Sequence, residues 1–235
     1  AFITDLYKGL ICYDVTDPLN PVEKWFYETK MDAINTLVDS NRAFLINQSL
    51  GLEILDLSNM DEPKLLCEIP GWANSRKVTI HDNCAYVYMG SAGARCVDIS
   101  NPVQPVYRGS FDCPGSIFNI MVQDQYAYLA AYKDGLRVVD ISSPFDPSET
   151  GFWDNAEYTS VFDVKLKGNY AFVCMSGGGM AVIDISDKSN PVEKGYLDTP
   201  GFSYSLDVNE YLACIADRDS LIIVDITNPL NPERI

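Results

Sequence analysis

Residues 168–191 read GNYAFVCMSGGGMAVIDISDKSNP, and this stretch decides the fold because its pattern recurs along the chain. It contains two short runs, 170–174 and 180–184, that are separated by a glycine-rich turn. Aromatic and β-branched residues dominate both runs, a composition typical of strands rather than helices. Proline cannot donate to a strand ladder, and Asp and Ser side chains hydrogen-bond nearby backbone in turns, so the Asp-Ile-Ser segment and Pro191 end the second run. The stretch predicts two adjacent strands followed by a turn.

The same unit occurs six times. Its signature is an aspartate followed by a β-branched residue or leucine and then by Ser or Thr, found at Asp14, Asp56, Asp98, Asp140, Asp184 and Asp225. Successive spacings are 42, 42, 42, 44 and 41 residues. A proline stands seven residues after each aspartate, and a glycine stands five residues before each one except the last, where Ser220 replaces it. Because these positions recur in every unit, we interpret the aspartates as turn caps and the glycines as turn residues.

Each unit contains four predicted strands. A third run follows the proline, as in 192–197, and a fourth precedes the next pair of runs, as in 161–166. No window of a dozen residues shows sustained helical spacing. Four strands repeated at this period are typical of β-propeller blades, whereas β-helix coils are shorter. We therefore expect an all-β protein in which residues 1–235 form one domain, a six-bladed β-propeller of about 42-residue, four-stranded repeats.

The first blade is expected to lack its inner strand in this chain. Residues 1–3 align with residues 43–45, so the sequence starts within the second strand of its first unit. An open inner edge leaves backbone groups unpaired. We therefore expect either further residues beyond the termini or a neighbouring chain that completes the first blade.

Composition excludes several classes of partner and site. The formal net charge of −16 argues against binding to nucleic acid or to an anionic membrane surface. No stretch approaches eighteen apolar residues, so no membrane span is expected. A single histidine, His81, excludes His-pair metal sites, and the seven cysteines form no C-x-x-C pair. No cofactor and no metal ligand are expected, and a disulfide between Cys84 and Cys96 across a short hairpin stays open.

Three recurring motifs resemble a known repeat. Tyr-Ala-Tyr/Phe-Val, Gly-Leu-x-Val-Ile/Val-Asp-Ile-Ser and x-Pro-x-x-Pro look like the LVIVD repeat, a family of bacterial and archaeal β-propeller proteins often found on or outside the cell. The resemblance covers essentially the whole chain. It implies the propeller fold and an extracellular or cell-surface location, but no common chemistry.

A binding site is expected where the units differ from one another. They differ at the start of the inner strand, the strand expected to line the central channel, where the equivalent residues are Asn35, Lys77, Asn119, Asp163 and Ser205. The preceding loops, on the same rim of the channel, contribute Trp72, Arg76, Tyr158, Phe202 and Tyr204. Polar groups edged by aromatic side chains at a loop-lined rim predict a ligand-binding surface.

Three functions remain open. The first is a non-catalytic extracellular or cell-surface propeller that serves as a recognition or assembly scaffold, with a protein or glycan partner on the channel rim. The second is a carbohydrate-active hydrolase or lyase that uses the rim carboxylates Asp154, Glu157 and Asp163, since glycoside cleavage needs paired carboxylates. The third is a structural subunit of a surface layer or filament. No catalytic residue is assigned.

Overall fold

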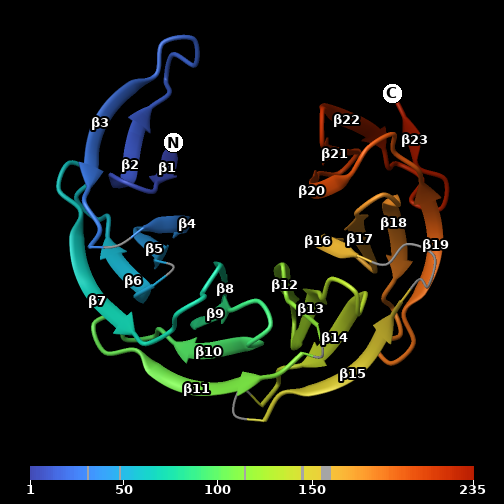
Figure 1. The fold of residues 1–235 in the computed structure, drawn as a ribbon, viewed down its shortest axis with the longest axis horizontal. Coiled ribbons are helices and arrows are strands. Elements are labelled where there is room, and N and C mark those ends of the chain that lie inside the picture. Colours follow the sequence, from blue (N-terminus) through green and yellow to red (C-terminus); the bar gives the residue numbers. More distant parts are fainter. Residues whose placement is uncertain (31, 48, 114, 144–145, 155–159) are drawn as a thin grey trace. The chain divides into compact units, whose positions relative to one another are not determined.

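The computed structural model describes residues 1–30, 32–47, 49–113, 115–143, 146–154 and 160–235. Strands and turns account for these residues, and no helix occurs among them. No described segment therefore forms a helix that crosses a membrane. The described chain divides into two compact units, residues 1–90 with 94–108 and residues 91–93 with 109–235 (Figure 1). The all-β class expected from the sequence is confirmed.

In the described part of the chain, 23 strands form six sheets, and strands that are consecutive in sequence lie side by side in each sheet. The first sheet contains β1(Phe2–Asp5), β2(Gly9–Asp14) and β3(Val22–Tyr27). The second contains β4(Ala33–Asp39), β5(Arg42–Asn47), β6(Gly51–Asp56) and β7(Lys64–Pro70). The third contains β8(Lys77–His81), β9(Cys84–Tyr88), β10(Ala94–Asp98) and β11(Val106–Phe111).

The other three sheets repeat this order. The fourth contains β12(Asn119–Gln123), β13(Tyr126–Ala130), β14(Leu136–Asp140) and β15(Ser148–Trp153). The fifth contains β16(Val161–Lys167), β17(Tyr170–Met175), β18(Gly179–Asp184) and β19(Val192–Leu197). The sixth contains β20(Ser203–Val208), β21(Leu212–Asp217), β22(Ser220–Asp225) and β23(Glu233–Arg234). Each repeat aspartate is thus the last residue of β2 or of its equivalent in another sheet, namely β6, β10, β14, β18 or β22.

The first sheet has three described strands. β1 pairs with β2, and its register, Phe2 opposite Cys12, matches that of Phe44 opposite Ile54 in β5 and β6. β1 therefore pairs with β2 in the same register in which β5 pairs with β6.

All seven cysteines are free in the structure. In the hairpin of β9 and β10, Cys84 lies opposite Asp98 and Cys96 lies opposite Tyr86. The two thiols are therefore diagonal neighbours rather than directly opposed residues.

The middle strands are buried on both faces, which explains their continuous apolar runs. Side chains alternate between the two faces of β17. Phe172 and Cys174 pack in a core cluster shared with the sixth sheet, whereas Ala171, Val173 and Met175 pack in a cluster shared with the fourth sheet. Within the second unit, the core therefore lies between consecutive sheets.

The repeat aspartates cap turns, as the sequence predicts. In all six repeats, one carboxylate oxygen accepts the backbone N–H of the Ser or Thr two residues later, at 2.8–3.0 Å. In Asp14, these hydrogen bonds with Thr16, together with Lys24, lower the pKa to about 2. The pKa of Asp56 is likewise lowered by the hydroxyl and backbone N–H of Ser58.

We expect these turns to make the stability of the fold depend on pH. A carboxyl whose pKa is lower in the folded state than in the unfolded state binds fewer protons when folded. Its contribution to the free energy of unfolding is therefore present above about pH 4 and is lost as pH falls towards 2. The thermal unfolding midpoint, followed by circular dichroism, should therefore fall over this range. Asp56→Asn keeps an oxygen acceptor for Ser58 but cannot titrate, so its midpoint should fall less steeply. Parallel curves for the two proteins would contradict the assignment.

Candidate functional site

Three inner strands, β4, β16 and β20, begin at β-bulges. The strand register shifts around Ile34 in β4, around Phe162 in β16 and around Tyr204 in β20, so that each of these residues has no partner in the ladder. A bulge changes the direction of the side chains beside it. The residues that differ between units, Asn35, Asp163 and Ser205, each follow one of these bulged residues directly.

Asp163 joins the inner strands of the second unit. Its side chain is buried, with 4% exposed. One carboxylate oxygen accepts from Asn119 Nδ2 in β12 and from Val164 N at 2.9 Å. The other accepts from Ser205 Oγ at 2.6 Å and from Leu206 N at 3.0 Å, both in β20. Four hydrogen bonds satisfy the carboxylate within the protein, so Asp163 acts as a tether between three strands.

A similar link between inner strands occurs in the first unit. Asn35 Oδ1 accepts from Val78 N at 3.4 Å and so connects β4 to β8. Arg76 is exposed and Lys77 is half-buried at the start of β8. Trp72 is buried in the core cluster, and the guanidinium carbon of Arg95 lies 5.2 Å from its ring centroid.

Aromatic rings form a row at the inner strands of the second unit. We call Phe118, Phe162, Tyr204 and Tyr132 the aromatic ladder. The ring centroids are 4.8 Å apart for Phe118 and Phe162 and 5.4 Å apart for Phe162 and Tyr204. Tyr132 lies 5.4 Å from both Phe118 and Phe162. The contacts of Phe162 with Phe118, Tyr132 and Tyr204 are edge-on, a geometry that is favourable for aromatic pairs. Phe162 and Tyr204 thus lie in β16 and β20, and Phe118 directly precedes β12.

Tyr132 is held in a backbone conformation that bulky residues rarely adopt. Its φ is 52°, in the left-handed region. Two backbone hydrogen bonds with Val161, of 3.0 and 2.9 Å, fix it against the start of β16. Backbone strain of this kind is concentrated at functional sites.

A second buried carboxylate holds the loop before β20. Asp217 is 3% exposed and accepts from the hydroxyls of Thr199 and Ser203 at 3.1 and 3.2 Å and from Gly201 N at 2.9 Å. This loop carries Phe202, which is 42% exposed next to Tyr204, which is 50% exposed. Hydrogen bonds to Asp217 therefore fix the loop that carries Phe202 and leads to Tyr204.

The structure brings together Asn119, Asp163, Ser205 and Tyr204 from the predicted set and places Asn35 and Lys77 in the other unit. Tyr158 and Glu157 lie outside the described residues. The sequence reasoning missed three residues, Phe118, Tyr132 and Phe162. The signal that could have found them is an aromatic residue directly before the variable position, which occurs in three successive repeats. Nowhere in the described ranges do three His, Cys, Asp or Glu side chains gather as a metal site would require.

Comparisons with known proteins identify the repeat. The LVIVD repeat model matches residues 73–113, 114–155, 160–199 and 200–234. No curated protein matches the sequence. A functionally unknown protein from Desulfotomaculum acetoxidans DSM 771 is similar in structure, with a TM-score of 0.81 and 13% identity over 95% of this chain and 74% of that one.

Two further solved structures share the fold. BamB from Moraxella catarrhalis has a TM-score of 0.64 and 14% identity, over 94% of this chain and 77% of its own. Apo AztD from Citrobacter koseri has a TM-score of 0.66 and 17% identity, over 99% of this chain and 69% of its own. The chain is a β-propeller protein and belongs to the LVIVD repeat family.

Proposed function

We propose that this protein is a non-catalytic recognition module that binds a protein or glycan partner through the aromatic ladder and Phe202. The observation that carries the proposal is the row of rings at the start of three consecutive inner strands, of which Tyr204 is half exposed. Tyr and other aromatic side chains contribute strongly to protein interfaces, because they combine a large contact area with few rotatable bonds.

The hydrogen bonds of the buried carboxylates Asp163 and Asp217 favour a binding function over a catalytic one. A general acid or a nucleophile must reach the reacting atoms with a free oxygen. Both oxygens of Asp163 already accept hydrogen bonds from neighbouring strands, and both oxygens of Asp217 accept them from its loop. We assign these two groups to positioning the neighbouring rings, Phe162 and Phe202.

Loss of the exposed rings is expected to weaken binding by about tenfold or more, because an aromatic hot spot contributes at least 1–2 kcal/mol. The test compares the natural chain with Tyr204→Ala and Phe202→Ala on glycan arrays and against candidate protein partners, followed by titration of each hit. Tyr211→Ala is the matched control, since Tyr211 is 56% exposed but lies in the turn at the far end of β20. Equal losses from Tyr204→Ala and Tyr211→Ala would contradict the proposed surface.

The location and the completeness of the propeller are part of the same proposal. Membership of the family supports an extracellular or cell-surface location, which protease accessibility on intact cells would test. Six repeat aspartates, each at the end of a strand in its own sheet, support six blades in one domain. The equivalence of β1 to β5 supports a first blade that a further strand completes beside β1.

A further inference from the structure

Two polar side chains are buried in the first unit without hydrogen-bond partners. Asn47, at the end of β5, is 0% exposed, and Glu53, in β6, is 1% exposed. Among the described residues, nothing bonds to the oxygen or the nitrogen of the Asn47 amide or to Oε2 of Glu53. Buried polar groups in native proteins nearly always have a partner, which can be a bound water or an ion. These atoms therefore point to a ligand that they hold together.

Both side chains face the first sheet. Because side chains alternate along a strand, Asn47 lies on the same face of β5 as Leu45, which packs in a core cluster with Leu10 of β2. Glu53 lies opposite Leu45, and Glu68 in β7 lies opposite Glu53. One amide and two carboxyl groups thus share one face of the second sheet.

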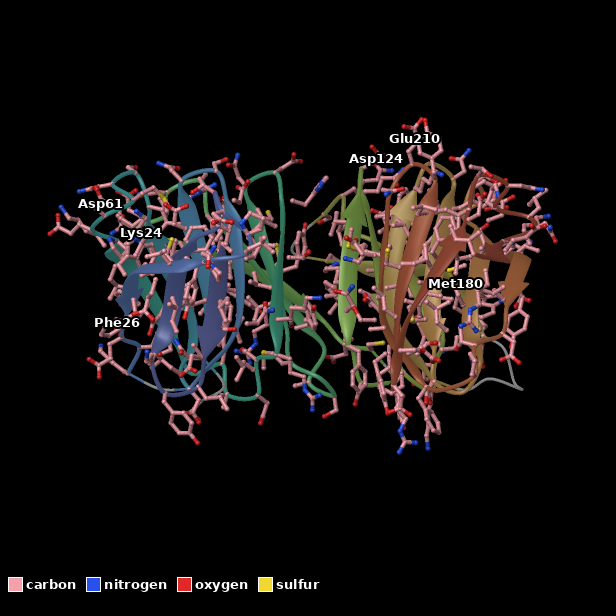
Figure 2. The ribbon with its side chains drawn as sticks, turned by 90° about the horizontal axis from the view of Figure 1, so that it is seen from above. Lys24, Phe26, Asp61, Asp124, Met180 and Glu210 are labelled. Carbon is pink, nitrogen blue, oxygen red and sulfur yellow. The ribbon has the colours of Figure 1, made fainter. Side chains whose placement is uncertain are left out.

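These side chains lie at one end of the first unit. Figure 2 shows Phe26 and Asp61 towards opposite ends of this unit. The site lies at the end of Phe26, whose neighbour Tyr27 completes β3. The loop after β3 carries Lys30, whose ammonium nitrogen is 2.6 Å from a carboxylate oxygen of Glu68. The side chains of Lys30 and Glu68 are 69% and 24% exposed, so solvent reaches the site from this side.

The charges at this site favour a cation. Burial and the nearby Glu68 carboxylate raise the pKa of Glu53. Burial, together with the same two carboxylates, also raises the pKa of Tyr27 to about 12. Lys30 and the Asn47 amide offset part of the rise at Glu53, although the amide does not reach hydrogen-bond geometry. Like charges directly opposite each other on two strands are unfavourable, and a cation between them relieves the repulsion.

The sixth sheet shows how the chain satisfies the equivalent position by itself. Asn47 lies opposite Ala33 just before the bulge of β4, as Asp217 lies opposite Ser203 just before the bulge of β20. Asp217 accepts a hydrogen bond from the Ser203 hydroxyl at 3.2 Å. Ala33 has no hydroxyl to donate. The second sheet therefore keeps the buried polar group but not the donor that serves it in the sixth.

We infer that Asn47, Glu53 and Glu68 bind a calcium ion. Calcium takes carboxylate and amide oxygens, and water can complete its shell on the solvent side of Glu68. Since the amide oxygen of Asn47 supplies a ligand, this site does not need a third carboxylate. The ion displaces the ammonium group of Lys30 from Glu68. The site lies in the first unit and is independent of the aromatic ladder.

The test measures calcium binding by the metal-free chain. A calorimetric titration with CaCl₂ should show a saturable site. Calcium at about ten times its Kd should raise the thermal unfolding midpoint by about 3 °C or more. MgCl₂ at the same concentration is the control for general screening of the net charge of −16. It should raise the midpoint clearly less, because Mg²⁺ demands near-octahedral geometry and gives up its waters reluctantly.

Three variants locate the ion. Glu53→Gln keeps the shape but removes a charged ligand, so calcium should bind at least about tenfold more weakly. The calcium-free midpoint of Glu53→Gln should not fall, because a buried carboxylate beside a like charge is itself unfavourable. Lys30→Met removes the competing ammonium group and should tighten binding about threefold or more. Glu62→Gln is the matched control, since Glu62 is 69% exposed, pairs with Lys64 and follows Asp61 at the other end of the unit. It should bind calcium as the natural chain does.

Two results would overturn the inference. One is a natural chain that shows no saturable response to calcium, or the same response to magnesium, which would identify a buried water as the partner of Asn47 and Glu53. The other is a Glu53→Gln chain that folds and binds calcium as tightly as the natural chain does. If Glu53→Gln did not fold, Lys30→Met would decide, because unchanged calcium binding in that variant would place the ion away from Glu68.

Discussion

Replacing Asp163 with alanine is expected to lower the free energy of unfolding by about 4 kcal/mol, because several buried donors lose their acceptor at once. Asn119 Nδ2, Val164 N, Ser205 Oγ and Leu206 N all donate to this carboxylate. No water replaces it easily, since the side chain is 4% exposed. Urea unfolding followed by tryptophan fluorescence gives the change as a shift of the midpoint at constant slope.

Two further variants make this measurement specific. Asp207→Ala, in the same strand β20, removes a carboxylate whose side chain is 82% exposed and which pairs with Lys165 at 3.4 Å, so it should cost less than about 1 kcal/mol. Asp163→Asn keeps the shape but turns one oxygen into a donor that faces Leu206 N, and should cost about 2 kcal/mol. If Asp163→Ala were as stable as Asp207→Ala, the carboxylate would not be a tether.

The same variants distinguish a recognition module from a glycosidase. A catalytic carboxylate is usually destabilising in the free protein, because its environment is arranged for the transition state. Loss of Asp163 from such a site would leave the fold intact or strengthen it. A large loss of stability in Asp163→Asn, together with weaker partner binding, agrees with a side chain that positions the aromatic ladder.

The repeat made the fold predictable from the sequence. In every sheet, β2 or the strand equivalent to it ends at a repeat aspartate, and every such aspartate caps a turn as expected. These features are local, since the hydrogen bond spans two residues and the strand period is two. Local features repeated six times do not depend on long-range contacts, which a single sequence does not show.

The contacts between the inner strands were predictable in part. The variable position led to Asn119, Asp163 and Ser205, which do meet. The bulges at Phe162 and Tyr204 follow from hydrogen-bond register between strands, which the order of residues does not reveal. Trp72 shows the opposite failure, since its loop predicted a rim residue and the structure places it in the core under Arg95.

Replacing Gly179 with alanine is expected to lower the free energy of unfolding by about 3 kcal/mol, from left-handed backbone strain together with a steric clash. Its φ is +66°, and a Cβ would lie closer than 3.0 Å to the carbonyl oxygen of Leu197 and to Thr199 N. Both neighbours are backbone atoms of β19 and the loop after it, so neither can rotate away. Thermal and urea unfolding would measure the loss.

Gly168→Ala is the matched control, because Gly168 has a φ of +58° but nothing lies within 4 Å of the added Cβ. It should cost about 1 kcal/mol, the backbone strain alone. The sixth repeat shows why the glycine is needed in the other five. Ser220 pairs with Asp217 across a two-residue turn, whereas Gly179 pairs with Met175 across three residues, and the shorter turn accounts for the spacing of 41. Ser220 has no positive φ, and that role passes to Arg218. Ser220→Ala should therefore leave stability nearly unchanged, and equal losses from Gly179→Ala and Ser220→Ala would contradict a requirement set by turn length.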